Sequence, residues 1–237
     1  PPYTDKVKAP ELNEGKLGGH GYELVYGMFL EPAAASAAER KMPFKFLEIG
    51  LGCNMQYGPG ASVKLWRSML DFPGAEIWEA DYDAACVHTA REHGQLDGVH
   101  TLTGDQEDPD VLADWVRESG GGFDFVVDDG GHSNPQIATS FRALWPEVNP
   151  GGFYFMEDLM AGRLSSFGYA SDRHESMSAV VQDWIDQLLI IDDDSALAGA
   201  AKARHPLPPA VKFIMCIAKA CVIAKCAQGE IYAKCPG

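Results

Sequence analysis

The chain has 237 residues, of which 46% are hydrophobic and 10% aromatic, and its formal net charge is −15. This length and apolar content suffice for the core of one large domain, and we expect a single domain over residues 1–237. The negative charge opposes attraction to a phosphate backbone, so no nucleic-acid partner is expected. No uninterrupted apolar stretch reaches the roughly 20 residues that span a bilayer, so no membrane contact is expected from this chain.

Strand-like and helix-like segments alternate along the chain, separated by short runs of Gly, Pro and Asp. Residues 1–43 are expected to form an N-terminal helical segment. The expected strands are 44–50, 75–81, 99–105, 123–130 and 151–159, and the expected helices are 61–70, 83–93, 108–118, 135–148 and 176–191. Residues 160–175 form a long loop, either a lid over a site or a surface loop. Residues 211–226 read as a closing antiparallel hairpin. These β-α units predict an α/β fold with a doubly wound, mostly parallel, seven-stranded sheet.

Two of the expected strands end abruptly in carboxylates. Asp129 follows the apolar run of residues 123–130, with His132 three residues later, and Glu157 and Asp158 end the run of residues 151–159. Open α/β sheets bind their ligands at the carboxyl ends of strands. Clustered carboxylates repel one another, and Mg²⁺ or Mn²⁺ would relieve that repulsion. The alternative is that these are solvated carboxylates at helix N-termini.

A glycine loop follows the first expected strand. Gly50 and Gly52 would let the backbone approach a ligand closely, but Met55 stands where a dinucleotide-binding motif needs a third glycine. A nicotinamide-dependent oxidoreductase is therefore a weaker interpretation. A non-catalytic binding module is a further alternative.

The segment Glu48-Ile49-Gly50-Leu51-Gly52 resembles the ExGxG motif of class I S-adenosylmethionine-dependent methyltransferases. The resemblance implies S-adenosyl-L-methionine as cofactor, with Asp81 on its ribose and Asp105 beside its adenine. The full set of cofactor-binding residues that we expect is Glu48, Gly50, Ser62, Asp81, Asp105, Gln106, Asp128 and Tyr22.

The segments GHGYELVYGMF (19–29), YGPGASVKLW (57–66), TGDQ (103–106) and VDDGGHSN (127–134) resemble the mycinamicin-type, metal-dependent sugar O-methyltransferases. This resemblance implies a Mg²⁺ or Mn²⁺ site at Asp129, Glu157 and Asp158, and His132 as general base. It also implies a sugar-containing small molecule or glycan as acceptor. A catechol-like or other natural-product hydroxyl is the alternative acceptor, and homo-oligomerisation stays open.

Four of these roles have structural alternatives. His132 would otherwise cap the helix that starts near Pro135, and Ser62 would cap the helix of residues 61–70. Asp128 would face solvent, and Tyr22 would pack in the core.

The six cysteines show no CxxC spacing, so a structural zinc site is not expected. Buried free thiols are the default expectation, with a Cys53–Cys86 or Cys226–Cys235 bridge as alternatives. The chain begins with Pro1 and not with Met, which suggests that a leading segment has been removed. If that segment was a signal anchor, the Golgi lumen is the expected location, and the cytoplasm is the alternative.

Overall fold

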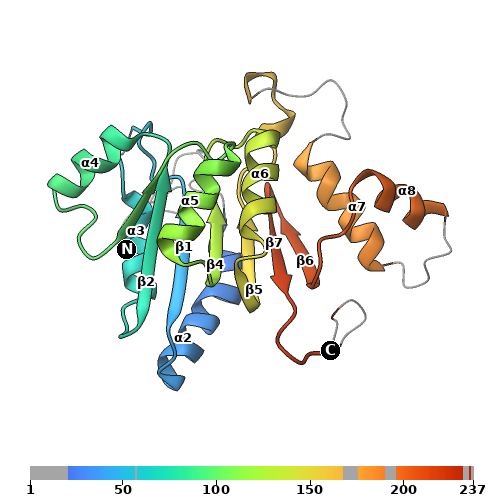
Figure 1. Cartoon of the computed structure of the whole chain (residues 1–237), viewed down its shortest axis with the longest axis horizontal. Helices are drawn as coiled ribbons and strands as arrows, with labels where there is room; N and C mark the ends of the chain where they lie inside the picture. The colour runs from blue at the N-terminus through green and yellow to red at the C-terminus, as the bar shows by residue number, and fades with distance from the viewer. Residues whose placement is uncertain (1–20, 57, 168–175, 190–195, 232–234, 236–237) are drawn as a thin grey trace, which may run out of the picture.

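The computed structural model describes residues 21–56, 58–167, 176–189, 196–231 and 235. Seven strands form one sheet in the order β3-β2-β1-β4-β5-β7-β6 (Figure 1), which confirms the predicted fold class. The strands are β1 (Phe44–Ile49), β2 (Ala75–Asp81), β3 (His100–Thr103), β4 (Phe123–Asp128), β5 (Val148–Met156), β6 (Val211–Ile217) and β7 (Ala220–Lys225). The first five strands are parallel, and β7 pairs antiparallel with both β5 and β6, as expected for the closing hairpin.

Helices cover both faces of the sheet. Figure 1 shows α5 and α6 in front of the strands and α2 behind them. The helices are α1 (Glu23–Val25), α2 (Glu31–Arg40), α3 (Ala61–Met69), α4 (Ala84–Glu92), α5 (Pro109–Ser119), α6 (Asn134–Leu144), α7 (Met177–Leu189) and α8 (Ala196–Arg204). A π-helical segment, η1 (Tyr26–Leu30), joins α1 to α2, and two 3-10 turns, η2 (Ala161–Arg163) and η3 (Ser165–Phe167), follow β5.

The strand pattern explains why both faces are covered. Successive side chains of a strand point to opposite faces, and here both faces are apolar. Phe46 packs with α2 and α3 on one face, whereas its neighbour Leu47 packs with α5 and α6 on the other. In β5, Phe155 packs on the same face as Phe46, and its neighbour Tyr154 packs on the same face as Leu47.

Two expected boundaries were wrong. Helix α6 ends at Leu144, before the expected residue 148, because Pro146 has no backbone N–H with which to continue the helical hydrogen bonds. The chain then enters β5 at Val148, which pairs with Phe123 of β4. Helix α8 was not expected, because its alanine-rich sequence carries no amphipathic pattern.

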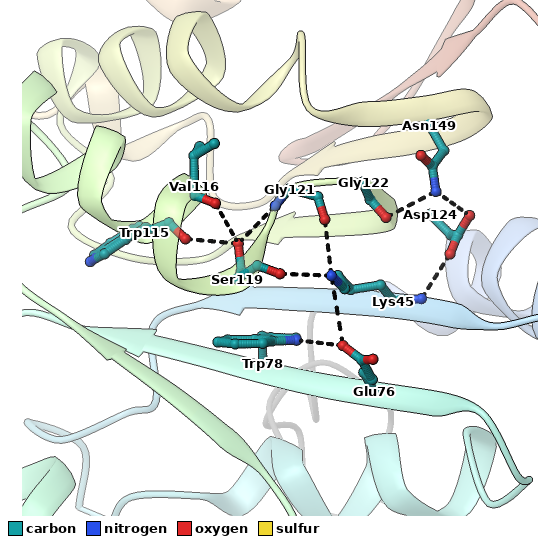
Figure 2. A network of polar contacts seen from close by, with 10 residues as sticks. All are labelled: Lys45, Glu76, Trp78, Trp115, Val116, Ser119, Gly121, Gly122, Asp124 and Asn149. Carbon is teal, nitrogen blue, oxygen red and sulfur yellow. Dashed lines mark hydrogen bonds and ion pairs between the residues drawn. The ribbon is translucent and has the colours of Figure 1, made fainter.

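A network of hydrogen bonds links the amino ends of the central strands (Figure 2). These ends lie opposite the carboxyl ends, where Asp129 and Asp158 are found. The Lys45 ammonium donates to the carbonyl oxygens of Ser119 and Gly121, at 2.7 and 3.1 Å. The Asp124 carboxylate accepts from the Lys45 backbone N–H and from the Asn149 amide, at 2.7 and 2.9 Å. These bonds link β1, β4 and β5, and their residues lie away from the carboxyl ends of the strands.

All six cysteines are paired, so the expectation of free thiols was wrong. The disulfides are Cys53–Cys86, Cys216–Cys221 and Cys226–Cys235. Cys86 lies in the first turn of α4, and the fold brings it to Cys53 in the glycine loop. Among the described residues, no helix is both long enough and apolar enough to cross a membrane.

Candidate functional site

A cavity of about 350 Å³ lies at the carboxyl ends of the parallel strands. The strand order reverses between β1 and β4, and ligands of open α/β sheets bind at such a point. Loops after β1, β2, β3, β4 and β5 all contribute to the lining. Of the predicted site residues, it includes Gly50, Ser62, Asp81, Asp105, Gln106, Asp129, His132 and Asp158.

Gly50 follows β1, where the chain turns along the cavity. Its φ is +108°, a conformation that only glycine adopts readily. A Cβ at Gly50 would lie 2.2 Å from the backbone carbonyl oxygen of Asp129. The glycine therefore lets the end of β1 pass directly beside the first of the strand-end carboxylates.

Asp81 ties the glycine loop to the loop after β2. Its Oδ2 accepts from the backbone N–H of Leu51 at 3.0 Å, and its Oδ1 accepts from that of Asp83 at 2.9 Å. Asp105, after β3, accepts from the backbone N–H of Glu107 at 2.9 Å. A carboxylate has about four acceptor sites, so each of these residues retains capacity for a ligand hydroxyl or amine.

Three predicted cofactor-binding residues lie one layer behind the cavity. Glu48, Asp128 and Tyr22 are fully buried and are not among the lining residues. Each nevertheless bonds a residue that lines it. Glu48 accepts from Ser62 at 2.5 Å, Asp128 accepts from Gln106 at 2.9 Å, and Tyr22 donates to Asp158 at 2.5 Å. Their side chains therefore orient lining residues.

Asp128 lies in the most enclosed part of this layer. Burial raises the pKa of its carboxyl group above the usual value for aspartate, although hydrogen bonds from Ser140, Gln106 and Tyr154 oppose that rise. Gln106 also accepts from the backbone N–H of Gly131 at 2.8 Å. The alternative that Asp128 faces solvent was wrong.

Asp129, His132 and Asp158 form the one cluster of metal-ligating side chains found among the described residues. One ligand atom from each lies within 4.8 Å of the others. The His132 Nε2 is 3.8 Å from Asp129 Oδ1 and 3.9 Å from Asp158 Oδ2. His132 and Asp158 both have positive φ, 59° and 50°, which is uncommon outside glycine and which clusters at functional sites. The two carboxylates suit Mg²⁺ or Mn²⁺, which prefer oxygen ligands.

Glu157, the remaining predicted ligand, is placed differently. It is 1% exposed, and its Oε1 accepts a hydrogen bond from the Tyr26 hydroxyl. It is not in the three-residue cluster. Sequence reasoning missed this tyrosine, although Tyr22 and Tyr26 stand four residues apart, the spacing of one helical face.

The capping alternatives for His132 and Ser62 were wrong. Helix α6 is capped by Ser133, which forms a reciprocal capping box with Gln136. Ser62 lies inside α3, and its hydroxyl donates to Glu48. Of the 160–175 loop, residues 168–175 lie outside the described residues, so the lid stays a prediction.

The cavity is lined by acidic side chains. Its described lining includes Asp81, Asp105, Asp129 and Asp158, and it includes no lysine or arginine. Such a site attracts cations and repels a pyrophosphate, which proteins usually hold with backbone N–H groups and basic side chains.

The chain is similar to several sugar-modifying enzymes. It is 37% identical over 139 residues to the mycinamicin VI 2''-O-methyltransferase of Micromonospora griseorubida, a match that covers 57% of this chain and 32% of that protein. It is 35% identical over 173 residues to the demethylmacrocin O-methyltransferase of Streptomyces fradiae, covering 70% of this chain and 41% of that protein.

The sequence resemblance is thereby confirmed. The chain is similar to macrolide and deoxysugar O-methyltransferases. The matches span about a third to two fifths of those relatives' own length. A search against models of known protein families finds no match.

The fold is shared with a solved member of the family. The methyltransferase MycE of mycinamycin biosynthesis, solved in complex with Mg, SAH and mycinamycin VI, superposes with a TM-score of 0.65 and 24% identity. The superposition covers 92% of this chain and 53% of the MycE chain. At that identity the likeness establishes the shared fold.

Proposed function

We propose that this chain is an S-adenosylmethionine- and divalent-metal-dependent O-methyltransferase that acts on a sugar hydroxyl. The observation that carries the proposal is the single cavity that joins the glycine loop to Asp129, His132 and Asp158. A methyl donor bound along the loop would have its reactive end beside the acidic cluster. The family relatives, which are named for O-methylation of glycosylated natural products, support the same reaction.

The charge of the cavity favours this cofactor. S-adenosylmethionine carries a cationic sulfonium and no phosphate, which suits a lining with four carboxylates and, among its described residues, no lysine or arginine. In this proposal Asp81 accepts the ribose hydroxyls, and Asp105 and Gln106 lie at the adenine end. Glu48, Asp128 and Tyr22 would act from behind the lining residues that they bond.

The reaction is an in-line displacement. The acceptor oxygen forms a bond to the methyl carbon, the carbon–sulfur bond breaks, and the hydroxyl proton must leave. A divalent cation held by Asp129 and Asp158, with Glu157 as the further predicted ligand, would stabilise negative charge on that oxygen as a Lewis acid. His132 would accept the proton, because its imidazole is next to both carboxylates, which would be engaged as metal ligands.

Two further proposals concern the cellular compartment of the protein and the identity of its metal ion. Three disulfides and the absence of any free cysteine support an oxidising compartment. We propose the Golgi lumen as this compartment, with Mn²⁺ as an alternative to Mg²⁺. Imaging of the tagged full-length protein with a Golgi marker tests this location.

Two binding and activity measurements test the function. Calorimetry should detect S-adenosylmethionine binding and no NAD binding, and Asp81→Ala should weaken the former by about 1.5–3 kcal/mol. A methyl-transfer screen with free hexoses, nucleotide sugars and a catechol should give product with a sugar. Product from the catechol alone would reject a sugar as the acceptor, but it would still support methyl transfer to a hydroxyl.

A further inference from the structure

The adjacent carboxylates Glu157 and Asp158 are each contacted by a tyrosine from the same short helical segment. Tyr22 lies at the start of α1, and Tyr26 begins the π-helical segment η1. We propose that Tyr22 and Tyr26 are positioning residues of the metal site. The inference rests on the proposed function, and it makes the N-terminal helical segment part of that site.

Tyr22 holds one side of Asp158. Its hydroxyl donates to Oδ1 at 2.5 Å and accepts from the Asp158 backbone N–H at 3.2 Å. The other oxygen, Oδ2, lies 3.9 Å from the His132 ring. The tyrosine thus occupies one carboxylate oxygen and leaves the second directed at the cluster. Its bond to the Asp158 N–H also restrains the backbone of Asp158, whose φ is 50°.

Tyr26 holds Glu157 in the same manner. Its hydroxyl donates to Oε1, and both residues are buried, at 2% and 1% exposure. The π-helical turn that contains Tyr26 is itself a rare conformation that is frequent at functional sites. Two carboxylates that follow each other in sequence are therefore held by hydroxyls one helical turn apart.

The tyrosine rings are fixed by aromatic packing. Both contact Phe155 of β5 edge to face, with centroids 5.6 Å from Tyr22 and 5.4 Å from Tyr26. Tyr26 also packs against Trp66, at 4.9 Å, and the Trp66 indole donates to Glu48 behind the glycine loop. Rotation of either hydroxyl away from its carboxylate would disrupt this packing, so the carboxylates are oriented before any cation binds.

Tyrosine-to-phenylalanine variants isolate the hydroxyls, because the rings and their packing stay. We would measure the Kd of Mn²⁺ by electron paramagnetic resonance on protein saturated with S-adenosylhomocysteine, and the melting temperature of each variant. Tyr22→Phe and Tyr26→Phe should each raise the Mn²⁺ Kd by about 10- to 100-fold, the usual cost of removing a group that orients a metal ligand. Their methyl-transfer rates should recover toward wild type at saturating metal.

Ser119→Ala is the matched control. It also removes one buried hydroxyl, but at the amino ends of the strands, where Ser119 bonds the carbonyl of Trp115 and the N–H of Gly121. It should lower the melting temperature and leave the Mn²⁺ Kd unchanged.

Tyrosine variants that lose thermal stability as Ser119→Ala does, with a wild-type Mn²⁺ Kd, would overturn the inference. If Tyr26→Phe does not fold, Tyr22→Phe decides the question alone. A wild-type protein that binds no Mn²⁺ would instead reject the proposed function, so the two failures are distinguishable.

Discussion

Gly50 and Asp129 are in direct backbone contact, although they belong to different motifs. The position of a Cβ on Gly50 is 2.2 Å from the Asp129 carbonyl oxygen, and the Asp129 N–H donates to the carbonyl of the preceding Ile49 at 2.9 Å. The glycine loop and the backbone that carries Asp129 therefore cannot move independently. A change in one should be measurable in the other.

Gly50→Ala should impair cofactor and metal binding together. The new methyl group would displace the Asp129 backbone, and alanine would be strained at a φ of +108°. We expect losses of more than about 10-fold in both affinities by calorimetry. Gly58→Ala is the control, because Gly58 has a φ of +78° and no atom within 4 Å of its Cβ position. An alanine at position 50 that affects only stability would contradict the coupling.

The Cys53–Cys86 disulfide should organise the glycine loop for cofactor binding. Cys53 lines the cavity, and Cys86 is fixed in α4, where its N–H donates to Asp83 at 3.0 Å. The paired Cys→Ser variant should bind S-adenosylmethionine about 3- to 10-fold more weakly, because the loop must then be ordered on binding.

The bridge of Cys226 to Cys235 provides the control for that variant, since neither residue lines the cavity. Its paired serine variant should change the melting temperature and not the cofactor Kd. Equal cofactor affinity in both paired variants would show that the first bridge serves stability alone.

Much of the fold follows from the sequence because local patterns determine it. The apolar runs before Asp129 and Glu157 are long enough only for buried strands, and Pro and Gly mark their ends. Because these strands are parallel, Asp129 and Asp158 lie at the same end of the sheet, as predicted. Asp81 and Asp105 also reach the cavity for this reason.

The contacts that the sequence did not reveal all join distant segments. The bonds of Tyr22 and Tyr26 to the end of β5 cross more than a hundred residues, and no local pattern encodes such a pairing. The Cys53–Cys86 bridge was an expected alternative to free thiols, but the sequence could not decide it, because the bridge depends on where α4 packs. Glu48 was correctly associated with the glycine loop, but its burial behind Ser62 could be seen only in three dimensions.

Asp183 should make the contact between α7 and α8 sensitive to acid. It accepts from Arg204 at 2.5 Å and contacts the His205 ring at 2.7 Å, and the Arg204 hydrogen bond, with that of His205, lowers the pKa of Asp183 below its usual value. A carboxyl group with a lowered folded-state pKa contributes stability that is complete above its unfolded-state pKa, about 3.9, and is lost as pH falls through the folded-state value.

Asp183→Asn should therefore lower the melting temperature near neutral pH. The difference from wild type should shrink as the pH falls below about 4. Thermal denaturation followed by circular dichroism between pH 7 and pH 2 measures it. A difference that stays constant over that range would show that the charge of Asp183 is not responsible.

His132 should be required for turnover even when the metal site is full. At saturating Mg²⁺ and S-adenosylmethionine, His132→Ala should lose about 10²- to 10⁴-fold in rate, the usual contribution of a general base. Its metal affinity is measured separately, because the ring also lies within the ligand cluster. If added Mg²⁺ restores the wild-type rate, His132 is a ligand and not the base.

We propose that this cavity performs metal-dependent methyl transfer. The most direct measurement is the initial rate of methyl transfer from S-adenosylmethionine to an accepted sugar, as free Mg²⁺ is titrated into wild-type protein and Asp129→Ala after treatment with EDTA. We predict a wild-type rate near zero in excess chelator that rises to saturation with Mg²⁺, and an Asp129→Ala rate that stays near zero while cofactor binding persists. A full wild-type rate in excess chelator would contradict the account.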